Sequence, residues 1–177
     1  MKISTKNIVI GALLIGLAII IPVIIPIKIV IPPFSATLFS HVPLILAMFI
    51  NPAIAVCVAL GSAIGFIISL GPIVAARAAM HVFFVFVGAY MVKKNRSIYV
   101  IAFVTMIIHS VSDMLIVYLL HIAGLLKLGS AMSTVQYIIA VGTSVHHLVD
   151  FAIALVIYAA VRKASKAEIF RPLRFKW

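Results

Sequence analysis

Apolar segments long enough to cross a lipid bilayer follow one another along nearly the whole chain, and this feature constrains the fold most strongly. The 177 residues are 66% hydrophobic and 10% charged, with a mean hydropathy of +1.34, which lies far from soluble globular domains. A bilayer core about 30 Å thick requires roughly 20 apolar residues per helical crossing, which leaves room for about six helices. We therefore predict an all-α integral membrane protein with a single transmembrane domain over residues 1–177.

Proline, glycine and clusters of charge mark the boundaries of the predicted helices. We expect helices near residues 7–25, 38–50, 52–70, 73–92, 97–121 and 133–162. The second segment is short for a crossing, and Asn51-Pro52 separates it from the third, which predicts a tight helical hairpin covered by surrounding protein. The linker 26–37 contains three prolines but is too apolar for a solvated loop. We interpret it as an outer lid, with simple packing on the helix ends as an equal alternative.

The distribution of basic residues predicts the orientation, because Lys and Arg near helix ends are retained on the cytoplasmic side. With six alternating spans, most of them fall on one side: Lys2, Lys6, Lys93, Lys94, Arg96, Arg162, Lys163, Lys166, Arg171, Arg174 and Lys176. Both termini are therefore predicted to be cytoplasmic, with the basic residues contacting anionic lipid headgroups. The net charge of +11 does not indicate nucleic-acid binding, because these residues are not interleaved with stacking aromatics.

Ionisable side chains occur inside three predicted spans with one shared spacing. Arg77 and His81, His109 and Asp113, and His146 and Asp150 are each four residues apart, which places each pair on one helix face. Ionisable groups in a membrane usually face the bundle interior or a wet cavity. At about 1.5 Å of rise per residue, these groups fall between the outer surface and the midplane. The candidate site in the spans comprises Arg77, His81, His109, Asp113, Gln136, Tyr137, Thr143 and His146.

Two interpretations of this polar layer remain open. In the first, it is a pocket for a small polar solute whose anionic group forms bidentate hydrogen bonds with Arg77. The lid then contributes the ring of Phe34 and hydrogen bonds from Ser35, Thr37 and His41. In the second, Arg77 pairs with Asp113, and the histidines tie helices together. We expect Asp150 to be structural, holding His146 or His147 in one tautomer.

Other function classes find less support in the sequence. Six histidines raise the alternative of a haem or metal protein that uses His81, His109 and His146, but no HExxH or CxxCH motif is present. Cys57 is the only cysteine, so no internal disulfide and no CxxC site can form. No GxSxG nucleophile setting occurs. We predict a non-enzymatic protein without a cofactor, and a stand-alone proton-coupled carrier remains a further alternative.

The first predicted helix carries Ala12 and Gly16 in a small-xxx-small pattern that permits close helix contact. Over nearly its whole length the chain resembles the substrate-binding S components of energy-coupling factor (ECF) vitamin transporters. The resemblance rests on "IGALLIGLAII", similar to the AxxxA motif of that family, on "SATLFSHVPLILAMFINP", and on "GPIVAARAAMHVFFVFVGAYMVKK". The second alanine of the family motif is Gly16 here, which keeps a small residue.

The resemblance implies a vitamin-binding subunit of a prokaryotic plasma membrane that captures its substrate from outside. It implies contact through Ala12 and Gly16 with a transmembrane coupling protein (T component), and two partner ATP-binding-cassette ATPases that hydrolyse ATP. No Walker motif occurs in this chain. The resemblance is to the pantothenate- and niacin-type branches, and a cationic pocket favours a carboxylate vitamin. We place pantothenate slightly ahead, because its polar groups suit Asp113 and Gln136, while the ring of nicotinate suits stacking on Phe34 or Tyr137.

Overall fold

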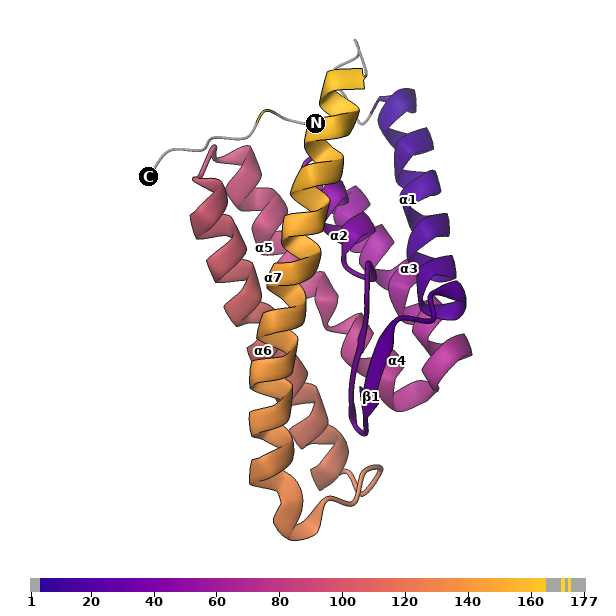
Figure 1. The fold of residues 1–177 in the computed structure, drawn as a ribbon, viewed down its shortest axis with the longest axis vertical. Coiled ribbons are helices and arrows are strands. Elements are labelled where there is room, and N and C mark those ends of the chain that lie inside the picture. Colours follow the sequence, from indigo (N-terminus) through magenta and orange to yellow (C-terminus); the bar gives the residue numbers. More distant parts are fainter. Residues whose placement is uncertain (1–3, 165–169, 171, 173–177) are drawn as a thin grey trace.

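Five long apolar stretches of helix dominate the computed structural model, which describes residues 4–164, 170 and 172 (Figure 1). They are α1 (Thr5–Ile24), α3 (Pro52–Leu70), α4 (Pro72–Ala79) together with α5 (His81–Lys93), α6 (Ile98–Ile122), and α7 (Met132–Ala164), which follows the 3-10 turn Gly129–Ala131. Each stretch is long and apolar enough to cross a membrane. The predicted all-α membrane fold is confirmed.

Local sequence accounts for several helix boundaries. The side chain of Ser4 accepts a hydrogen bond from the backbone N of Asn7 at the start of α1, at 3.2 Å. Asn51 does the same for the backbone N of Ala53 at 2.8 Å, and Pro52 follows it at the first position of α3. Gly71, with φ 85°, forms the turn between α3 and α4. The Asn51-Pro52 boundary is where the sequence predicted it.

Two predicted segments take a different form in the structure. The outer linker 26–37 contains a β-hairpin, in which β1 (Lys28–Ile31) pairs antiparallel with β2 (Phe34–Thr37) in a register that sets Lys28 opposite Thr37. Its two central prolines occupy the turn, where no ladder N–H is needed. The predicted helix 38–50 is reduced to α2 (Val42–Met48), which at about 1.5 Å per residue spans only about 10 Å and is too short to cross a membrane by itself.

The short helix α2 lies at the centre of the protein. All seven of its residues are buried, and it packs against α1, α3, α5 and α7. Leu44, Ile45 and Ala47 are fully buried, as are Phe49 after the helix and Phe84 on α5. The prediction that surrounding protein covers this segment is therefore correct. Gly11 faces Ile54 and Gly65 faces Ile19, so α1 and α3 run parallel, and the β-hairpin and α2 carry the chain back between them inside the bundle.

Small residues on both helices bring α1 and α3 into close contact: Gly11 on α1, where an added Cβ would lie 2.9 Å from Cγ2 of Ile54, and two glycines on α3. A Cβ added at Gly61 would lie 3.0 Å from Cγ2 of Ile15, and one at Gly65 would overlap the backbone carbonyl of Ile19. By contrast, a Cβ at Gly16 would meet no atom within 4 Å, and Ala12 is exposed. The Ala12 and Gly16 face of α1 is therefore open on the outside of the bundle.

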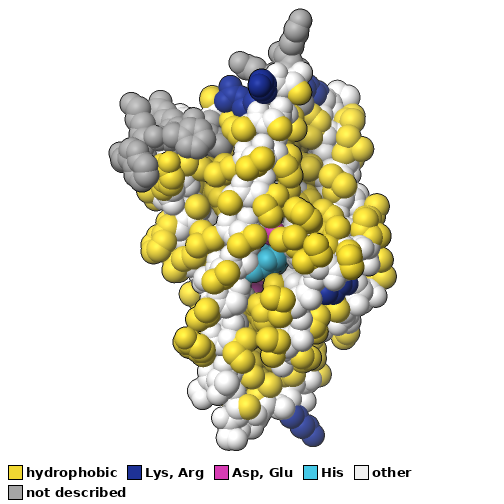
Figure 2. All heavy atoms as spheres, in the orientation of Figure 1, with side chains coloured by type: hydrophobic (Ala, Val, Ile, Leu, Met, Phe, Trp, Pro, Cys, Tyr) yellow, Lys and Arg dark blue, Asp and Glu magenta, His cyan; other side chains and the backbone are white. Residues whose placement is uncertain are grey.

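The first and last helices meet at one end of the molecule. Figure 1 shows that α1 begins where α7 ends, and Figure 2 shows Lys and Arg side chains gathered at this same end. This arrangement agrees with termini on one side of the membrane, and their cytoplasmic location stays a prediction. Several basic residues used for it lie outside the described residues: Lys2, Lys166, Arg171, Arg174 and Lys176.

Candidate functional site

A buried ion pair joins the α4 segment to α6. Nη2 of Arg77 donates to Oδ2 of Asp113 at 2.6 Å, and the two side chains are 5% and 1% exposed. The hydroxyl of Thr143 on α7 donates to the same oxygen at 3.2 Å. Three helices therefore converge on the Asp113 carboxylate. The Arg77 to Asp113 pair is the contact foreseen in the second interpretation of the sequence, and it is compatible with a substrate that replaces Asp113.

The hairpin covers this ion pair. Nη1 of Arg77 donates to the carbonyl oxygen of Pro33 at 2.8 Å, and its guanidinium carbon lies 5.6 Å from the centre of the Phe34 ring. The outer edge of the Phe34 ring lies against α7 at Gly142, where an added Cβ would be 2.5 Å from Cζ of Phe34. Phe34 therefore fills the space between Arg77 and α7.

A second buried carboxylate holds the start of α2. Asp150 on α7 accepts hydrogen bonds from the backbone N of Phe39 and of His41, both at 2.9 Å. Phe39 has a φ of 70°, a conformation rare for a non-glycine residue, in the tight turn that precedes α2. Nδ1 of His41 lies 3.3 Å from the same carboxylate without hydrogen-bond alignment. Asp150 therefore links α7 to the segment that leads from the hairpin into α2, together with the contact of Ser40 and His146 at 3.2 Å.

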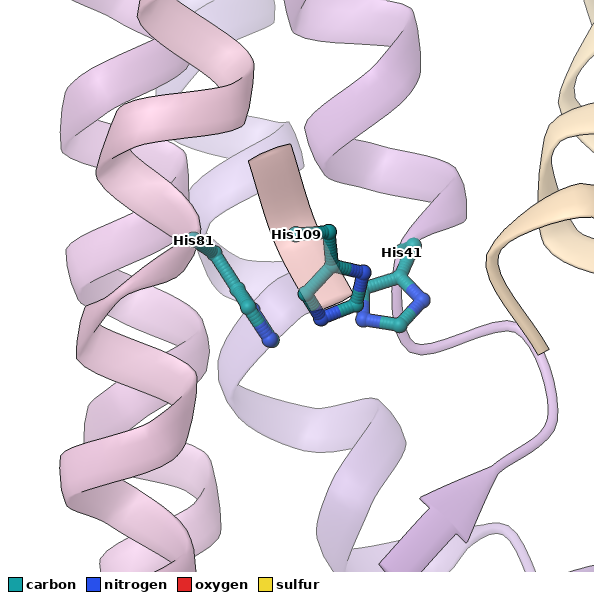
Figure 3. A group of neighbouring side chains, drawn as sticks. All are labelled: His41, His81 and His109. Carbon is teal, nitrogen blue, oxygen red and sulfur yellow. The ribbon is translucent and has the colours of Figure 1, made fainter. Parts of the chain in front are cut away.

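Five imidazoles fill the space between the two carboxylates. His41 lies at the N-terminus of α2, His81 begins α5 where the α4–α5 span is interrupted at Met80, and His109 lies in the middle of α6. Their ring centres are 4.6 to 4.7 Å apart, with planes nearly perpendicular. Figure 3 shows the three rings directed toward one another from three separate elements. His146 and His147 on α7 complete the histidine cluster and also contact His41.

A shallow groove leads from the surface of the bundle toward this cluster. It runs between the hairpin and α7, has a volume of about 440 Å³, and is mostly apolar. Its lining includes Phe34, Gly142 and His146, and the His146 side chain is 11% exposed. In Figure 2 a histidine and neighbouring acidic groups are visible at the centre of an otherwise hydrophobic face. The groove is thus one place where the polar interior reaches the surface.

Comparison with known proteins places the chain in a family. No protein-family model matches it, and no solved structure matches it significantly. The curated niacin transporter NiaX of Lactococcus lactis subsp. cremoris is 36% identical over 178 aligned positions, which cover 96% of this chain and 80% of the relative. The chain belongs to the family of this transporter. As a member of the NiaX family, it is a multi-pass protein of a prokaryotic plasma membrane, and its predicted S-component resemblance of the niacin type is confirmed.

In this NiaX-family protein, most of the predicted site residues come together. Arg77, Asp113 and Thr143 form the ion-pair layer, while His41, His81, His109 and His146 form the histidine cluster. On the hairpin, Phe34, Ser35 and Thr37 are buried. Gln136 donates to the backbone carbonyl of Met114 at 3.0 Å, and Tyr137 is 70% exposed on the outside of α7, so neither joins the cluster.

Sequence reasoning underrated four polar residues of the NiaX-family site. Asp150 holds His41 and the turn before α2, and its Oδ2 also lies 3.7 Å from Nε2 of His146, one of the two histidines with which it was paired in the prediction. Ser40 lies 3.2 Å from Nε2 of His146, and Thr105 and His147 form a hydrogen-bonded pair at 3.1 Å. The spacing of Thr105 and His109, four residues apart, is a signal that places both on one face of α6.

Proposed function

We propose that this protein is the substrate-specific S component of an ATP-driven ECF importer, and that nicotinate is its substrate. The name of the NiaX relative supports niacin, which reverses the order that the sequence alone suggested for pantothenate and nicotinate. The family resemblance supports capture from outside and delivery through a T component and two ATP-binding-cassette ATPases. No enzymatic step by this chain is part of the proposal.

The observation that carries the proposal is a buried cation whose hydrogen bonding is incomplete. Nε of Arg77, Oδ1 of Asp113 and Nδ1 of His81 are all buried, and none has a partner among the described residues. An unsatisfied buried polar group costs about 1–3 kcal/mol. A small ligand with a carboxylate and a ring nitrogen can satisfy such groups, because the carboxylate accepts from Arg77 and the ring lies flat among aromatic side chains.

The hairpin is the proposed lid. Phe34 separates Arg77 from the groove beside α7. The guanidinium of Arg77 donates both to the backbone carbonyl of Pro33 and to the Asp113 carboxylate. A carboxylate that binds Arg77 therefore competes with the lid, with Asp113, or with both. We infer that the hairpin moves when the vitamin enters, and that bound vitamin takes over hydrogen bonds that the lid and Asp113 make in this structure.

The test is nicotinate binding by calorimetry to the purified full chain in detergent. Arg77→Ala is expected to weaken binding by at least about 100-fold, because truncating one partner of a buried charge pair costs roughly 2–5 kcal/mol. Arg96→Ala is the matched control, since Arg96 is exposed in the turn that follows the other end of the span that contains Arg77. Pantothenate is titrated in parallel, and tighter binding of pantothenate than of nicotinate would reverse the proposed substrate.

A second variant separates binding from folding. Arg77→Ala leaves Asp113 buried without its charge partner, which alone can unfold the protein. Arg77→Met combined with Asp113→Asn removes both charges and keeps similar volumes, so the fold is expected to survive. Wild-type nicotinate affinity in this folded double variant would show that the ion pair is not the anchor.

A further inference from the structure

The three mutually facing imidazoles of His41, His81 and His109 have the arrangement of a metal-binding site. One ring nitrogen from each lies within 4.8 Å of the others, and the three side chains are at most 4% exposed. Zinc–nitrogen bonds of about 2.0–2.1 Å separate tetrahedral ligand atoms by roughly 3.4 Å. A contraction on the order of 1 Å would therefore bring the three nitrogens around one ion.

A hydrogen-bond chain fixes which nitrogen of His109 is available. The Thr105 hydroxyl donates to the carbonyl of Ile101 at 2.7 Å, so its oxygen accepts from Nε2 of His147 at 3.1 Å. Nδ1 of a neutral His147 then carries a lone pair and accepts from Nδ1 of His109 at 3.1 Å. Nε2 of His109 is left as a bare lone pair. Such an oriented imidazole is what metal sites require of a ligand.

The lone pair of His109 faces another acceptor. Its Nε2 lies 3.8 Å from Oδ2 of Asp113, an oxygen that accepts from Nη2 of Arg77 at 2.6 Å and has no proton to donate to His109 when the carboxylate is charged. His41 has a related setting, since its Nδ1 lies beside the Asp150 carboxylate and leaves Nε2 directed elsewhere. A carboxylate behind a histidine ligand is a common support in metal sites. Nδ1 of His81 has no partner among residues 4–164, 170 and 172.

The charges of the buried site also favour a bound cation. This site contains one guanidinium, Arg77, and two carboxylates, Asp113 and Asp150. With these three groups charged and the imidazoles neutral, its net charge is −1. Adding a monocarboxylate alone would bring this to −2 in a low-dielectric interior, which is costly. A divalent ion together with the monocarboxylate brings the net charge to zero.

We propose that His41, His81 and His109 bind one divalent transition-metal ion of the zinc class, which imidazole ligands suit. The second half of the proposal rests on the function proposed above: the ion leaves a coordination position for the carboxylate of the vitamin. His41 also belongs to a candidate group with His146 and Asp150. The first group is favoured, because Ser40 already lies 3.2 Å from Nε2 of His146, whereas Nδ1 of His81 is unpartnered within the described part of the chain.

The experiment is a Co²⁺ titration of the full chain, purified without a histidine tag and stripped with a chelator. Visible d–d absorption is expected to saturate at one Co²⁺ per chain and to disappear on adding Zn²⁺. His41→Ala, His81→Ala and His109→Ala should each weaken Co²⁺ binding by more than about 100-fold. His147→Ala should weaken it by about 10–100-fold and shift the cobalt band, because His109 loses its orientation.

His121→Ala is the control, because His121 bonds the loop after α6, outside the histidine cluster. Thermal unfolding verifies that each variant is folded. The metal site is overturned if wild-type protein shows no saturable cobalt band, if the folded cluster variants bind Co²⁺ as wild type does, or if His121→Ala loses binding equally.

Calorimetry with nicotinate separates the two halves of the proposal. Nicotinate should bind at least about 10-fold more tightly to the Co²⁺-loaded protein than to the stripped protein, because the ion supplies charge for the carboxylate. If nicotinate binds the loaded and the stripped protein equally well, and the protein takes up a proton on binding, a protonated imidazole supplies the charge instead of the ion. This result would overturn the half of the proposal in which the ion coordinates the vitamin but keep nicotinate as substrate. No nicotinate binding in either form would overturn the proposed function and this half together, while the Co²⁺ titration alone decides the metal site.

Discussion

Asp150 supports more of the buried site than its spacing from His146 predicted. Its two oxygens accept from the backbone of Phe39 and His41, and one of them also lies beside the His41 ring. The carboxylate thus anchors both the turn after the hairpin and the start of α2. A polar residue in this position combines backbone capping with orientation of a histidine.

Asp150→Asn is expected to destabilise the protein by about 1.5–3 kcal/mol, because an amide keeps one acceptor oxygen and loses one hydrogen bond to a charged group. Unfolding of the purified protein by added denaturing detergent measures this. Ser110→Ala is the control, since its hydroxyl bonds only the Ser144 hydroxyl and, at 3.5 Å, a backbone carbonyl. A stability of Asp150→Asn equal to that of the control would show that the carboxylate is dispensable.

Gly142 sets how closely the Phe34 ring can approach α7. Gly142→Ala would place a methyl group 2.5 Å from Cζ of Phe34, so the ring and its strand must shift outward. We expect nicotinate to dissociate at least about threefold faster, because overpacking of this kind costs typically 1–3 kcal/mol and here acts on the closed lid. Stopped-flow displacement measures the rate.

Phe34→Leu is the companion variant for this test. Adding it to Gly142→Ala restores space at the contact, so the two substitutions should be non-additive. Strictly additive effects on the dissociation rate would mean that Gly142 and Phe34 do not act through their contact.

Helix α1 has one face that packs against α3 and another that is open. Gly61 and Gly65 of α3 receive Ile15 and Ile19 on one face, while the face with Ala12 and Gly16 is open. In a membrane, helices associate through such close backbone packing rather than through the hydrophobic effect. The structure thus distinguishes glycines at the α1–α3 contact from Gly16, which has open space beside it.

Gly65→Leu and Gly16→Leu are therefore expected to fail in different ways. The first should destabilise the isolated protein, because its side chain meets the backbone of Ile19. The second should leave stability and nicotinate binding unchanged but abolish uptake and co-purification with the T component. Val111→Leu, at an exposed position of α6, is the control for added bulk on the lipid face. Full uptake by Gly16→Leu would remove this face of α1 from the partner interface.

These elements also show which parts of the fold were predictable. Arg77, His109 and Asp113 were found because spacing within one helix is local and fixes a common face. The partnership of His41 with Asp150 spans 109 positions, so no local pattern reports it. The hairpin was missed because its prolines were interpreted as loop signals, although the run of β-branched residues in "KIVI" before them is typical of a strand. The break at Met80 has no proline or glycine to mark it.

At the level of the whole molecule, the positions of the two chain ends give a testable topology. With Cys57 replaced by serine, a cysteine introduced at Asn95 should react with an impermeant thiol reagent only from the cytoplasmic side. A cysteine at Ser130, in the turn before α7, should react only from outside, because one predicted span separates the two positions. Labelling of Asn95→Cys in intact cells by the impermeant reagent would invert the orientation and place the proposed lid on the wrong side.

The anchoring of α2 by Asp150 has a consequence for how this chain enters the membrane. The backbone N of His41 finds its acceptor on a residue 109 positions later, so the turn before α2 is incompletely satisfied while α7 is still being synthesised. Chains truncated before α7 should therefore leave this segment accessible to protease, whereas the full chain protects it. Insertion and folding would then be separate events. The long helices enter the membrane in order of synthesis, and α2 reaches its final position last, after α7 has been inserted.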